Sequence, residues 1–299
     1  MTRSPTGIPG RIILSRKGFD SKYGGCASPI LFVGTMVSLP IWERGSGVKY
    51  GDLQTAEPKL NFGCLVDQLP GCNVPAARGA KRSEQQVHLD PDVRCGLHPR
   101  HSRVEWRALF GQSKNAERHL FNQGVGPDDL FLFFGWFHRI EEQLPPRFAG
   151  DADDEHVIWG WLQVERFFDP KTEQPQWAKH HPHCVHPRGT IYVGRRRLTF
   201  APKKPGGGIF PLYHGDLRLT HPAMRRERTF WRLPAFFARR LTYHANAEWA
   251  KDGAHVTVSS AKIGQEFVFN TKGHERAVAE WLQKVFAHAP NAAQAAGAR

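Results

Sequence analysis

The sequence predicts an α+β fold: a mixed, strand-rich single domain with a curved or barrel-like sheet, closed by a C-terminal helix. Three observations predict it. Short apolar runs alternate with Gly, Pro and Ser along most of the 299 residues, which is typical of strands and turns. Two aromatic runs stand near the middle of the chain. One stretch near its end has the three-to-four-residue apolar spacing of an amphipathic helix.

The N-terminal half begins with a predicted strand at Ile12–Leu14. We expect residues 1–10 to form a flexible extension and the domain to cover residues 11–287. Between about residues 58 and 82, Pro, Gly, Cys and Lys occur without periodicity, so an irregular insertion is predicted there. Apolar residues at both ends of the segment 107–121 frame a polar stretch, and this pattern predicts a helix.

The strongest strand signals are the aromatic runs 129–137 and 156–164, each preceded by a turn. We expect them to pair in a curved sheet, with Gly135 and Gly160 marking bulges or bends. A G-x-D-L turn, an aromatic strand and a second strand ending in G-x-L-x-V together resemble the core hairpin of PUA-like barrels, which hold nucleobases. A generic buried hairpin is the alternative interpretation.

The C-terminal third predicts several short strands and one helix. The helix covers residues 275–287, where Val278, Leu282 and Val285 lie on one face. We expect a disordered tail over residues 288–299 because the apolar spacing ends there. The strands are predicted at residues 190–193, 198–200, 217–220, 241–244, 256–259 and 265–269.

Composition excludes several classes of protein. No apolar run approaches the roughly 18 residues that a membrane span needs, and the N-terminus lacks the apolar core of a secretory signal. The five cysteines are odd in number and show no C-x-x-C spacing, which argues against a zinc knuckle or a disulfide framework. We therefore expect a soluble, cytoplasmic protein with reduced thiols and no membrane partner.

The chain is strongly basic. Its 41 Lys and Arg against 28 Asp and Glu give a net charge of +13, which favours polyanionic partners. Basic groups beside aromatic rings suit phosphate neutralisation combined with base stacking. A solvated basic face is an equally compatible interpretation. The basic and aromatic residues concerned are Arg195, Arg196, Arg197, Lys203, Lys204, Arg225, Arg226, Arg228, Arg239, Arg240, Phe230, Trp231, Phe236 and Phe237.

The loop after the first strand is rich in charge and glycine. Arg16 and Lys17 supply positive charge, Asp20 supplies an acceptor or a base, and the glycines allow backbone N–H groups to approach an anion. The loop matches neither the P-loop nor the dinucleotide fingerprint, and an ordinary turn is the alternative. Lys17 and Asp20 are candidate catalytic residues; the candidate nucleotide-binding residues are Arg16, Ser21, Gly24, Gly25 and Ser28.

Histidines cluster at residues 180–186. On an extended strand, His181 and His183 would project to the same side and could bind a divalent metal. No H-E-x-x-H or similar ligand spacing accompanies them, and Pro182 is equally compatible with a loop. We therefore assign no metal, and we expect one of these histidines to act in hydrogen bonding or acid/base chemistry.

Two further polar segments are candidates. The amide edges of Asn122 and Gln123 suit nucleobases, and Gly124 permits close approach, although the same residues make a good helix C-terminus. Glu266 is either a buried general acid or base, or a charge on a surface strand. No nucleophile sits in a recognisable elbow, so a catalytic triad is not assigned.

Taken together, these segments resemble the third of the nucleotide modification associated domain families. The resemblance spans residues 11–287 and favours one continuous domain. The sequence departs from the family pattern at Cys26-Ala27 and in its insertion. The motifs that carry the resemblance are I-I-L-S-R-K-G-F-D-S, Gly24-Gly25, Ser28-Pro29-Ile30, Ser38-Leu39-Pro40-Ile41, His88-Leu89-Asp90-Pro91, Phe110-Gly111-Gln112, Asn122-Gln123-Gly124-Val125-Gly126, the two aromatic runs, His181-Pro182-His183 and Gly264-Gln265-Glu266-Phe267.

The resemblance implies a protein that acts on a nucleotide, or on a base within DNA or RNA. The leading hypothesis is a modifying enzyme of transferase or hydrolase class, and the alternative is a non-catalytic reader of modified nucleic acid. Among the matched motifs, Arg16, Lys17 and Asp20 would form a phosphate or ribose contact with acid/base capacity, and His88 and Asp90 would complete that site. Gln123, Gln163, His181 and His183 would read or position a base, with Gln265 as a further base-binding candidate. His88, Asp90, His181 and His183 join Lys17 and Asp20 in the set of candidate catalytic residues. No cofactor or oligomeric state is predicted.

Overall fold

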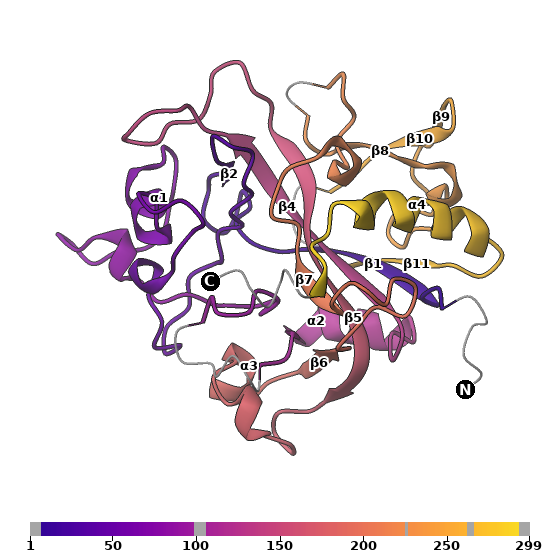
Figure 1. Cartoon of the computed structure of the whole chain (residues 1–299), viewed down its shortest axis with the longest axis horizontal. Coiled ribbons are helices and arrows are strands. Elements are labelled where there is room, and N and C mark those ends of the chain that lie inside the picture. The colour runs from indigo at the N-terminus through magenta and orange to yellow at the C-terminus, as the bar shows by residue number, and fades with distance from the viewer. Residues whose placement is uncertain (1–6, 99–105, 225–226, 262–265, 293–299) are drawn as a thin grey trace.

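The computed structural model describes residues 7–98, 106–224, 227–261 and 266–292 (Figure 1). Its main sheet has the strand order β11-β1-β4-β5-β6-β3, with β2 paired to β4 and β7 paired to β5. These strands are β1 (Arg11–Arg16), β2 (Ser28–Ile30), β3 (Leu109–Gln112), β4 (Leu130–Arg139), β5 (Glu155–Phe168), β6 (Thr190–Gly194), β7 (Gly207–Ile209) and β11 (Glu266–Asn270).

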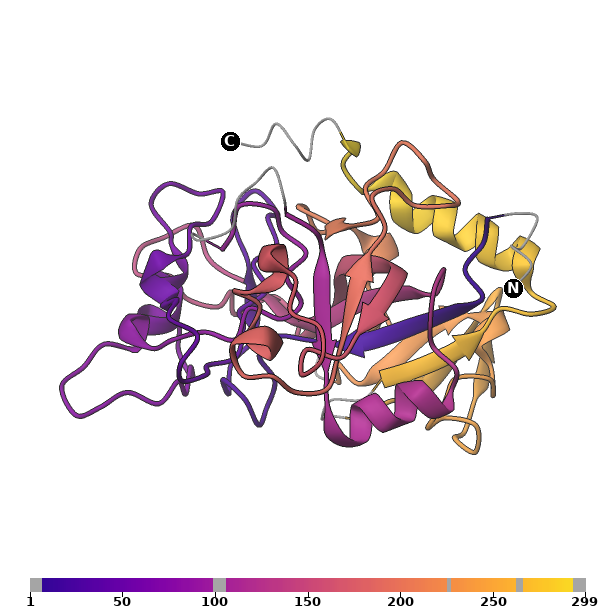
Figure 2. The same cartoon turned by 90° about the horizontal axis from the view of Figure 1, so that it is seen from below.

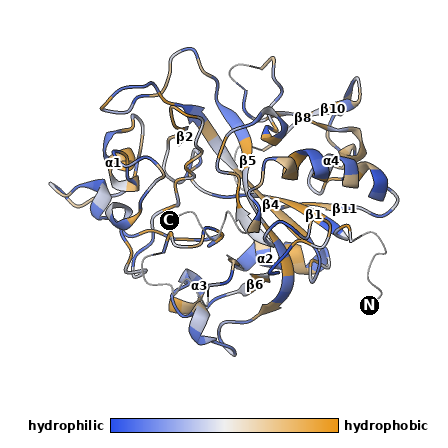
Figure 3. Ribbon diagram, in the orientation of Figure 1, coloured by the Kyte–Doolittle hydropathy of each residue, from blue (hydrophilic) through white to orange (hydrophobic). Residues whose placement is uncertain are grey.

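The aromatic runs form the centre of this sheet, as predicted. β4 and β5 pair antiparallel, and their register shifts between Phe133 and Phe134, next to the predicted bulge position Gly135. β4 pairs in parallel with β1, and both strands are buried on both faces, which explains their nearly continuous apolar sequences. Figure 3 shows the hydrophobic residues of β1, β4 and β11 gathered in the middle of the molecule.

The mixed, strand-rich α+β class is confirmed, but a barrel is not. β11 and β3 stand at the two ends of the strand order, and no pairing between described strands joins them. A smaller sheet of order β8-β10-β9 lies beside the main one. Its strands are β8 (Phe230–Pro234), β9 (Ala250–Asp252) and β10 (His255–Ser259).

Helices cover the sheet from two sides. α4 (Glu275–Ala287) has the bounds that the sequence predicts, and its buried face packs the ring of Phe286 5.3 Å from that of Trp161. α2 (Lys114–Asn122) lies on the other side of β1 and β11 from α4 (Figure 2). Neither these helices nor any other described one has the length and apolarity to cross a bilayer.

The N-terminal part of the chain packs a second apolar cluster around Tyr50 and Phe62. Its helix α1 (Phe62–Gln68) falls within the segment predicted to be irregular, and Asn61 caps it by accepting a hydrogen bond from the Cys64 N–H. The apolar residues of α1 were too few to give a visible period. A disulfide joins Cys26 to Cys72 in this cluster, so the expectation that all five thiols are reduced was wrong.

Several other local predictions were wrong. The helix predicted at residues 107–121 is present only in its second half, as α2; β3 and Ser113 precede it, so the apolar pair Leu109 and Phe110 belongs to a strand. The segments 198–200, 217–220 and 241–244 contain no strand; they are loops and turns, anchored by the buried side chains of Leu198, Leu217 and Leu241. A short apolar run between turn residues has the same sequence pattern whether it forms a strand or a buried loop.

Residues that the sequence assigned to flexible ends are packed where the structure describes them. Ile8 is buried in the main core, and the Thr271 hydroxyl donates to the Pro9 carbonyl, so the described part of residues 1–10 is packed. Ala289 is likewise buried. Short 3₁₀ turns complete the fold at Tyr50–Asp52, Arg82–Glu84, Gln176–Ala178, Gly215–Leu217 and Ala235–Phe237.

Candidate active site

The side chains of His88, Asp90, His181 and His183 converge in one nearly buried cluster, which we call the His–Asp cluster. His88 and Asp90 come from the loop that precedes β3. His181 caps the short helix α3 (Pro182–Val185), and His183 lies within it. The predicted extended strand or loop at this point is therefore a helix, because Pro182 occupies the first helical turn and the His181 ring accepts a hydrogen bond from the His183 N–H.

Asp90 is the centre of the cluster. Its Oδ1 lies 3.2 Å from Nε2 of His181, and its Oδ2 lies 3.6 Å from Nε2 of His88 and 3.9 Å from Nε2 of His183. Oδ1 also accepts a hydrogen bond of 2.7 Å from the Gly111 N–H of β3. A single carboxylate thus contacts three imidazoles and the edge of the sheet.

Outer contacts orient two of the rings. Nδ1 of His88 lies 2.7 Å from Oε2 of Glu43, whose other oxygen accepts a hydrogen bond from Arg188. Nδ1 of His183 lies 2.9 Å from the Arg188 carbonyl oxygen, to which it donates. In both rings the Nδ1–H donates to a group outside the cluster, and Nε2 is turned toward Asp90.

The cluster is strongly polarised. Burial alone would raise the pKa of Asp90, but the neighbouring imidazoles hold it well below its usual range. Burial would lower the pKa of His88, yet its contacts with Asp90 and Glu43 raise it to about 9. Burial lowers the pKa of His183 to about 4. The pKa values of His88 and His183 are therefore shifted in opposite directions, a pattern that is typical of functional sites.

Gly111 allows β3 to approach the cluster. A Cβ atom at this position would lie 2.6 Å from the His183 ring, closer than any real packing contact. The Phe110-Gly111-Gln112 motif therefore has a direct role at the site, through backbone approach at Gly111.

A second polar group lies across β3. Side chains alternate along a strand, so Phe110 and Gln112 face away from Gly111. Nζ of Lys17 lies 3.2 Å from Oε1 of Glu266 and 4.4 Å from the Phe110 ring centre. Gln112 Nε2 donates to the same carboxylate oxygen at 2.6 Å. Glu266 is thus a buried carboxylate, as one of the two sequence interpretations required, and its Oε2 has no hydrogen-bond partner.

Most of the other candidates in the N-terminal loop hold the loop itself. Oδ1 of Asp20 accepts hydrogen bonds of 2.7 Å from the N–H groups of Lys22 and Tyr23. Ser21 accepts one from Arg228, and Ser28 accepts one from Leu39 N–H. Gly24 and Gly25 have φ values of 90° and 70°, which glycine adopts readily.

Arg16 differs from its neighbours in that loop. Its guanidinium is buried and donates through Nη2 to the Ala261 carbonyl, while Nε and Nη1 have no hydrogen-bond partner. Burial lowers its pKa to about 10, against the opposing effect of Asp20. The structure therefore brings neither Arg16 nor Asp20 into the His–Asp cluster.

The amide candidates have structural positions in the fold. Gln163 is buried, donates to Thr199 Oγ1 at 2.7 Å and accepts from the Thr199 N–H at 2.8 Å. Asn122 ends α2 and Gln123 is its C-terminal cap, which agrees with the helix-end interpretation. Gly124 follows with a φ of 67°. Gln265 lies outside the described residues.

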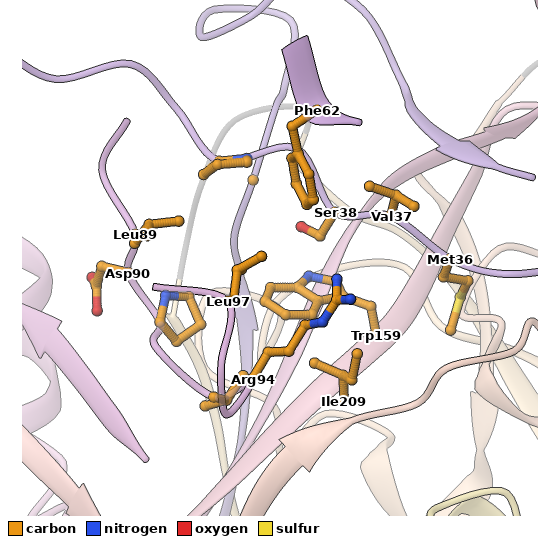
Figure 4. Close-up of a pocket in the computed structure, with 14 residues that line it drawn as sticks. Met36, Val37, Ser38, Phe62, Leu89, Asp90, Arg94, Leu97, Trp159 and Ile209 are labelled. Atoms are coloured by element: carbon orange, nitrogen blue, oxygen red, sulfur yellow. The ribbon is translucent and has the colours of Figure 1, made fainter. Parts of the chain in front are cut away.

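An apolar pocket adjoins the cluster on the other side of the loop that carries Asp90. Its volume is about 50 Å³, which accommodates a few water molecules and is smaller than a nucleobase. Figure 4 shows the Asp90 carboxylate at its edge, turned away from Trp159. Other lining residues include Gly18, Ser38, Pro40, Leu89 and Ile209.

The comparison with protein families decides the affiliation. A sequence model described as nucleotide modification associated domain 3 matches residues 11–270. The chain belongs to this family. The resemblance drawn from its motifs is thereby confirmed. No curated protein and no solved structure matches the chain.

The span matched to the nucleotide modification associated domain runs from β1 to β11. It contains the complete His–Asp cluster with its outer residues Glu43 and Arg188, and also the Lys17–Glu266 pair. Sequence reasoning named all four residues of the cluster but missed Glu43 and Arg188. Both lie in segments without a recognisable motif, and only the fold brings them together.

Proposed function

We propose that this protein is an enzyme that modifies a nucleotide or a base within nucleic acid, and that the His–Asp cluster is its catalytic centre. Family membership supports the link with nucleotide modification. The convergence of His88, Asp90, His181 and His183 around one buried carboxylate is the observation that carries the enzyme hypothesis. Burying such a group generally stabilises a fold no more than apolar packing would, so a functional reason is favoured.

The arrangement suits chemistry at one point. Because Glu43 and the Arg188 carbonyl bind the outer nitrogens, Nε2 of His88 and of His183 face the Asp90 carboxylate. A reacting group placed there would meet ring nitrogens and a carboxylate held in fixed orientations, which is the preorganisation that catalysis requires. The proposal covers both hydrolase and transferase chemistry, and the mass of the product distinguishes them.

Substrate access is proposed from the side of Glu43 and Arg188. The Arg188 side chain is 36% exposed, whereas those of Asp90, His181 and His183 are at most 4% exposed. A cationic group at the open side of the cluster suits a phosphate-bearing substrate. The net charge of +13 favours the same class of ligand.

The alternative, a non-catalytic reader, depended on aromatic surfaces that would stack bases. Phe131, Phe133 and Phe134 of the central hairpin are fully buried, as are Trp231 and Phe237 beside the basic clusters. Most aromatic rings of these runs are therefore unable to stack on a base; Trp136, Phe230 and Phe236 are partly exposed, and the Arg228 guanidinium lies 3.9 Å from the centre of the Trp136 ring. The enzyme hypothesis is the one that we retain.

The test is incubation of the purified protein with DNA, RNA and a nucleotide pool, with and without added divalent metals, followed by mass spectrometry of every nucleoside. We expect a mass shift that Asp90→Asn abolishes. His214→Asn, a surface histidine substitution, serves as the matched control and should retain the shift. A mass shift that persists in Asp90→Asn would remove the cluster from the mechanism.

A further inference from the structure

Three donor atoms of the His–Asp cluster are close enough to share one cation. The candidate donors of His88, Asp90 and His183 all lie within 4.8 Å of one another. Oδ2 of Asp90 is 3.6 Å from Nε2 of His88 and 3.9 Å from Nε2 of His183. Metal–ligand bonds of roughly 2.0–2.2 Å place neighbouring donors about 3.0–3.5 Å apart, so a small contraction would complete the site.

The outer contacts prepare both imidazoles for this role. A histidine that binds a metal through one nitrogen usually donates its other ring N–H to a carboxylate or to a backbone carbonyl. His88 has the first arrangement, with Glu43 at 2.7 Å, and His183 has the second, with the Arg188 carbonyl at 2.9 Å. These contacts leave Nε2 of each ring to face the shared centre.

His181 supplies an independent observation. Its side chain is fully buried, and its Nδ1 accepts a hydrogen bond from the His183 N–H, so the ring carries its proton on Nε2. That Nε2 lies 3.2 Å from Asp90 Oδ1 without the alignment of a hydrogen bond, and it has no hydrogen-bond partner. A fully buried N–H that meets the Asp90 carboxylate off-axis is also placed to donate to a water bound at the centre.

We propose that His88, Asp90 and His183 bind one divalent first-row transition metal, with His181 as a donor to Asp90 or to a metal-bound water. Two imidazoles and one carboxylate suit Zn²⁺ or Fe²⁺, whereas Mg²⁺ prefers oxygen donors. Three protein ligands leave positions open for water or substrate. From the sequence alone no metal was assigned, because one was considered only for His181 and His183, on an assumed extended strand.

The surface of the protein provides a matched comparison. His214, Asp216 and His288 also bring three donor atoms within 4.8 Å. Their side chains are 52%, 46% and 25% exposed, and Nδ1 of His214 already accepts from the Asp216 N–H. A metal ion at these exposed side chains would have to displace the water that solvates them, so we expect it to bind weakly at most.

The experiment titrates the 299-residue chain, stripped with a chelator, with Zn²⁺, with Fe²⁺ under anaerobic conditions and with Mg²⁺, and follows binding by calorimetry. Co²⁺ absorption reports the ligand geometry. We expect one tight equivalent of Zn²⁺ or Fe²⁺ and none of Mg²⁺. His183→Asn should abolish that equivalent, Glu43→Gln should weaken it by roughly 10–100-fold, and His288→Asn should leave it unchanged.

Circular dichroism identifies any variant that fails to fold, and Glu43→Gln retains all three proposed ligands, so it tests the site independently of them. The proposal is overturned if no tight equivalent binds, or if His183→Asn and His288→Asn behave alike. It does not rest on the proposed function: metal binding without any change in nucleoside mass would uphold the metal site and contradict the enzyme hypothesis.

Discussion

Asp90 shows how single residues build this site. The carboxylate is buried, yet three imidazoles and the Gly111 N–H surround it, so each oxygen has polar neighbours. Such a group is stable in the ionised form only while its partners remain in place. The residues that hold those partners are therefore as sensitive to substitution as the cluster itself.

Gly111→Ala tests that dependence at a position without any functional group. The added methyl would lie 2.6 Å from the His183 ring, which is fixed by its bond to the Arg188 carbonyl. We expect a loss of at least about tenfold in metal affinity and of nucleotide-modifying activity, with a destabilisation of about 1–3 kcal/mol from overpacking. Calorimetry and urea unfolding measure the two effects.

Gly150→Ala is the control, because a Cβ at that position meets no atom within 4 Å. It should leave both measurements at the wild-type values. Wild-type metal affinity in Gly111→Ala would mean that the His183 ring does not need its present position.

Sequence reasoning found the reactive residues more easily than their supports. His88, Asp90, His181 and His183 were predictable because histidine and aspartate in short motifs are themselves the signal. Glu43 and Arg188 were not, since isolated charged residues in loops are usually solvated. Asp20 shows the reverse: it was predicted to be a catalytic residue, but its carboxylate closes a turn.

At the scale of elements, Asp129 ties the start of β4 to β1. Its Oδ2 accepts from the Gly126 N–H at 2.9 Å and from Arg11 of β1 at 3.3 Å. Burial outweighs both contacts and raises the pKa of Asp129 from 3.8 to about 6. The junction of these two strands is therefore held by a carboxyl group that binds its proton more tightly in the folded chain.

This shift predicts a pH dependence of stability. Between pH 4 and 6 the folded state binds more protons at Asp129 than the unfolded state, so this contribution to stability is present at low pH and is lost as the pH rises through about 6. From pH 5 to pH 7 we expect the loss to be about 1 kcal/mol. Urea unfolding at the two pH values measures it.

Asp129→Asn should remove that part of the pH dependence, because the amide does not titrate. For each protein, the change in the free energy of unfolding from pH 5 to pH 7 is measured, and the two changes are compared. The contributions of the other titrating groups are the same in both proteins and cancel. An equal change in both proteins would show that Asp129 keeps its ordinary pKa in the fold.

Element prediction succeeded where one pattern was long and local. The aromatic runs of β4 and β5, and the stripe of α4, extend over many residues and allow one interpretation. It failed for α1 and for the strand β3, which are short and depend on capping by Asn61 and on pairing with β6. Such interactions join residues that no local window contains.

At the scale of the whole molecule, sheet closure and charge were the least predictable features. Strand pairing is non-local, so the sequence predicted strands but not that the sheet ends at β11 and β3. Some residues of the predicted basic clusters also have partners inside the fold. Arg195 pairs with Asp128, and Arg228 donates to Ser21 and lies over the Trp136 ring, while the neighbouring Trp231 is buried.

The remaining basic surface leads to a prediction about binding to nucleic acid. Arg239 and Arg240 are exposed, and the adjacent Phe237 is fully buried, although Tyr243 three residues further on is 58% exposed. We expect binding to DNA or RNA that depends little on sequence and weakens steeply with salt.

If both arginines contact phosphates, replacing Arg239 and Arg240 with glutamine should reduce the slope of log affinity against log salt by about 1.4–1.8. Fluorescence anisotropy over a salt series measures the slope, and Arg276→Gln, on the exposed face of α4, is the control. An unchanged slope in the double variant would place the phosphate contacts elsewhere on the protein.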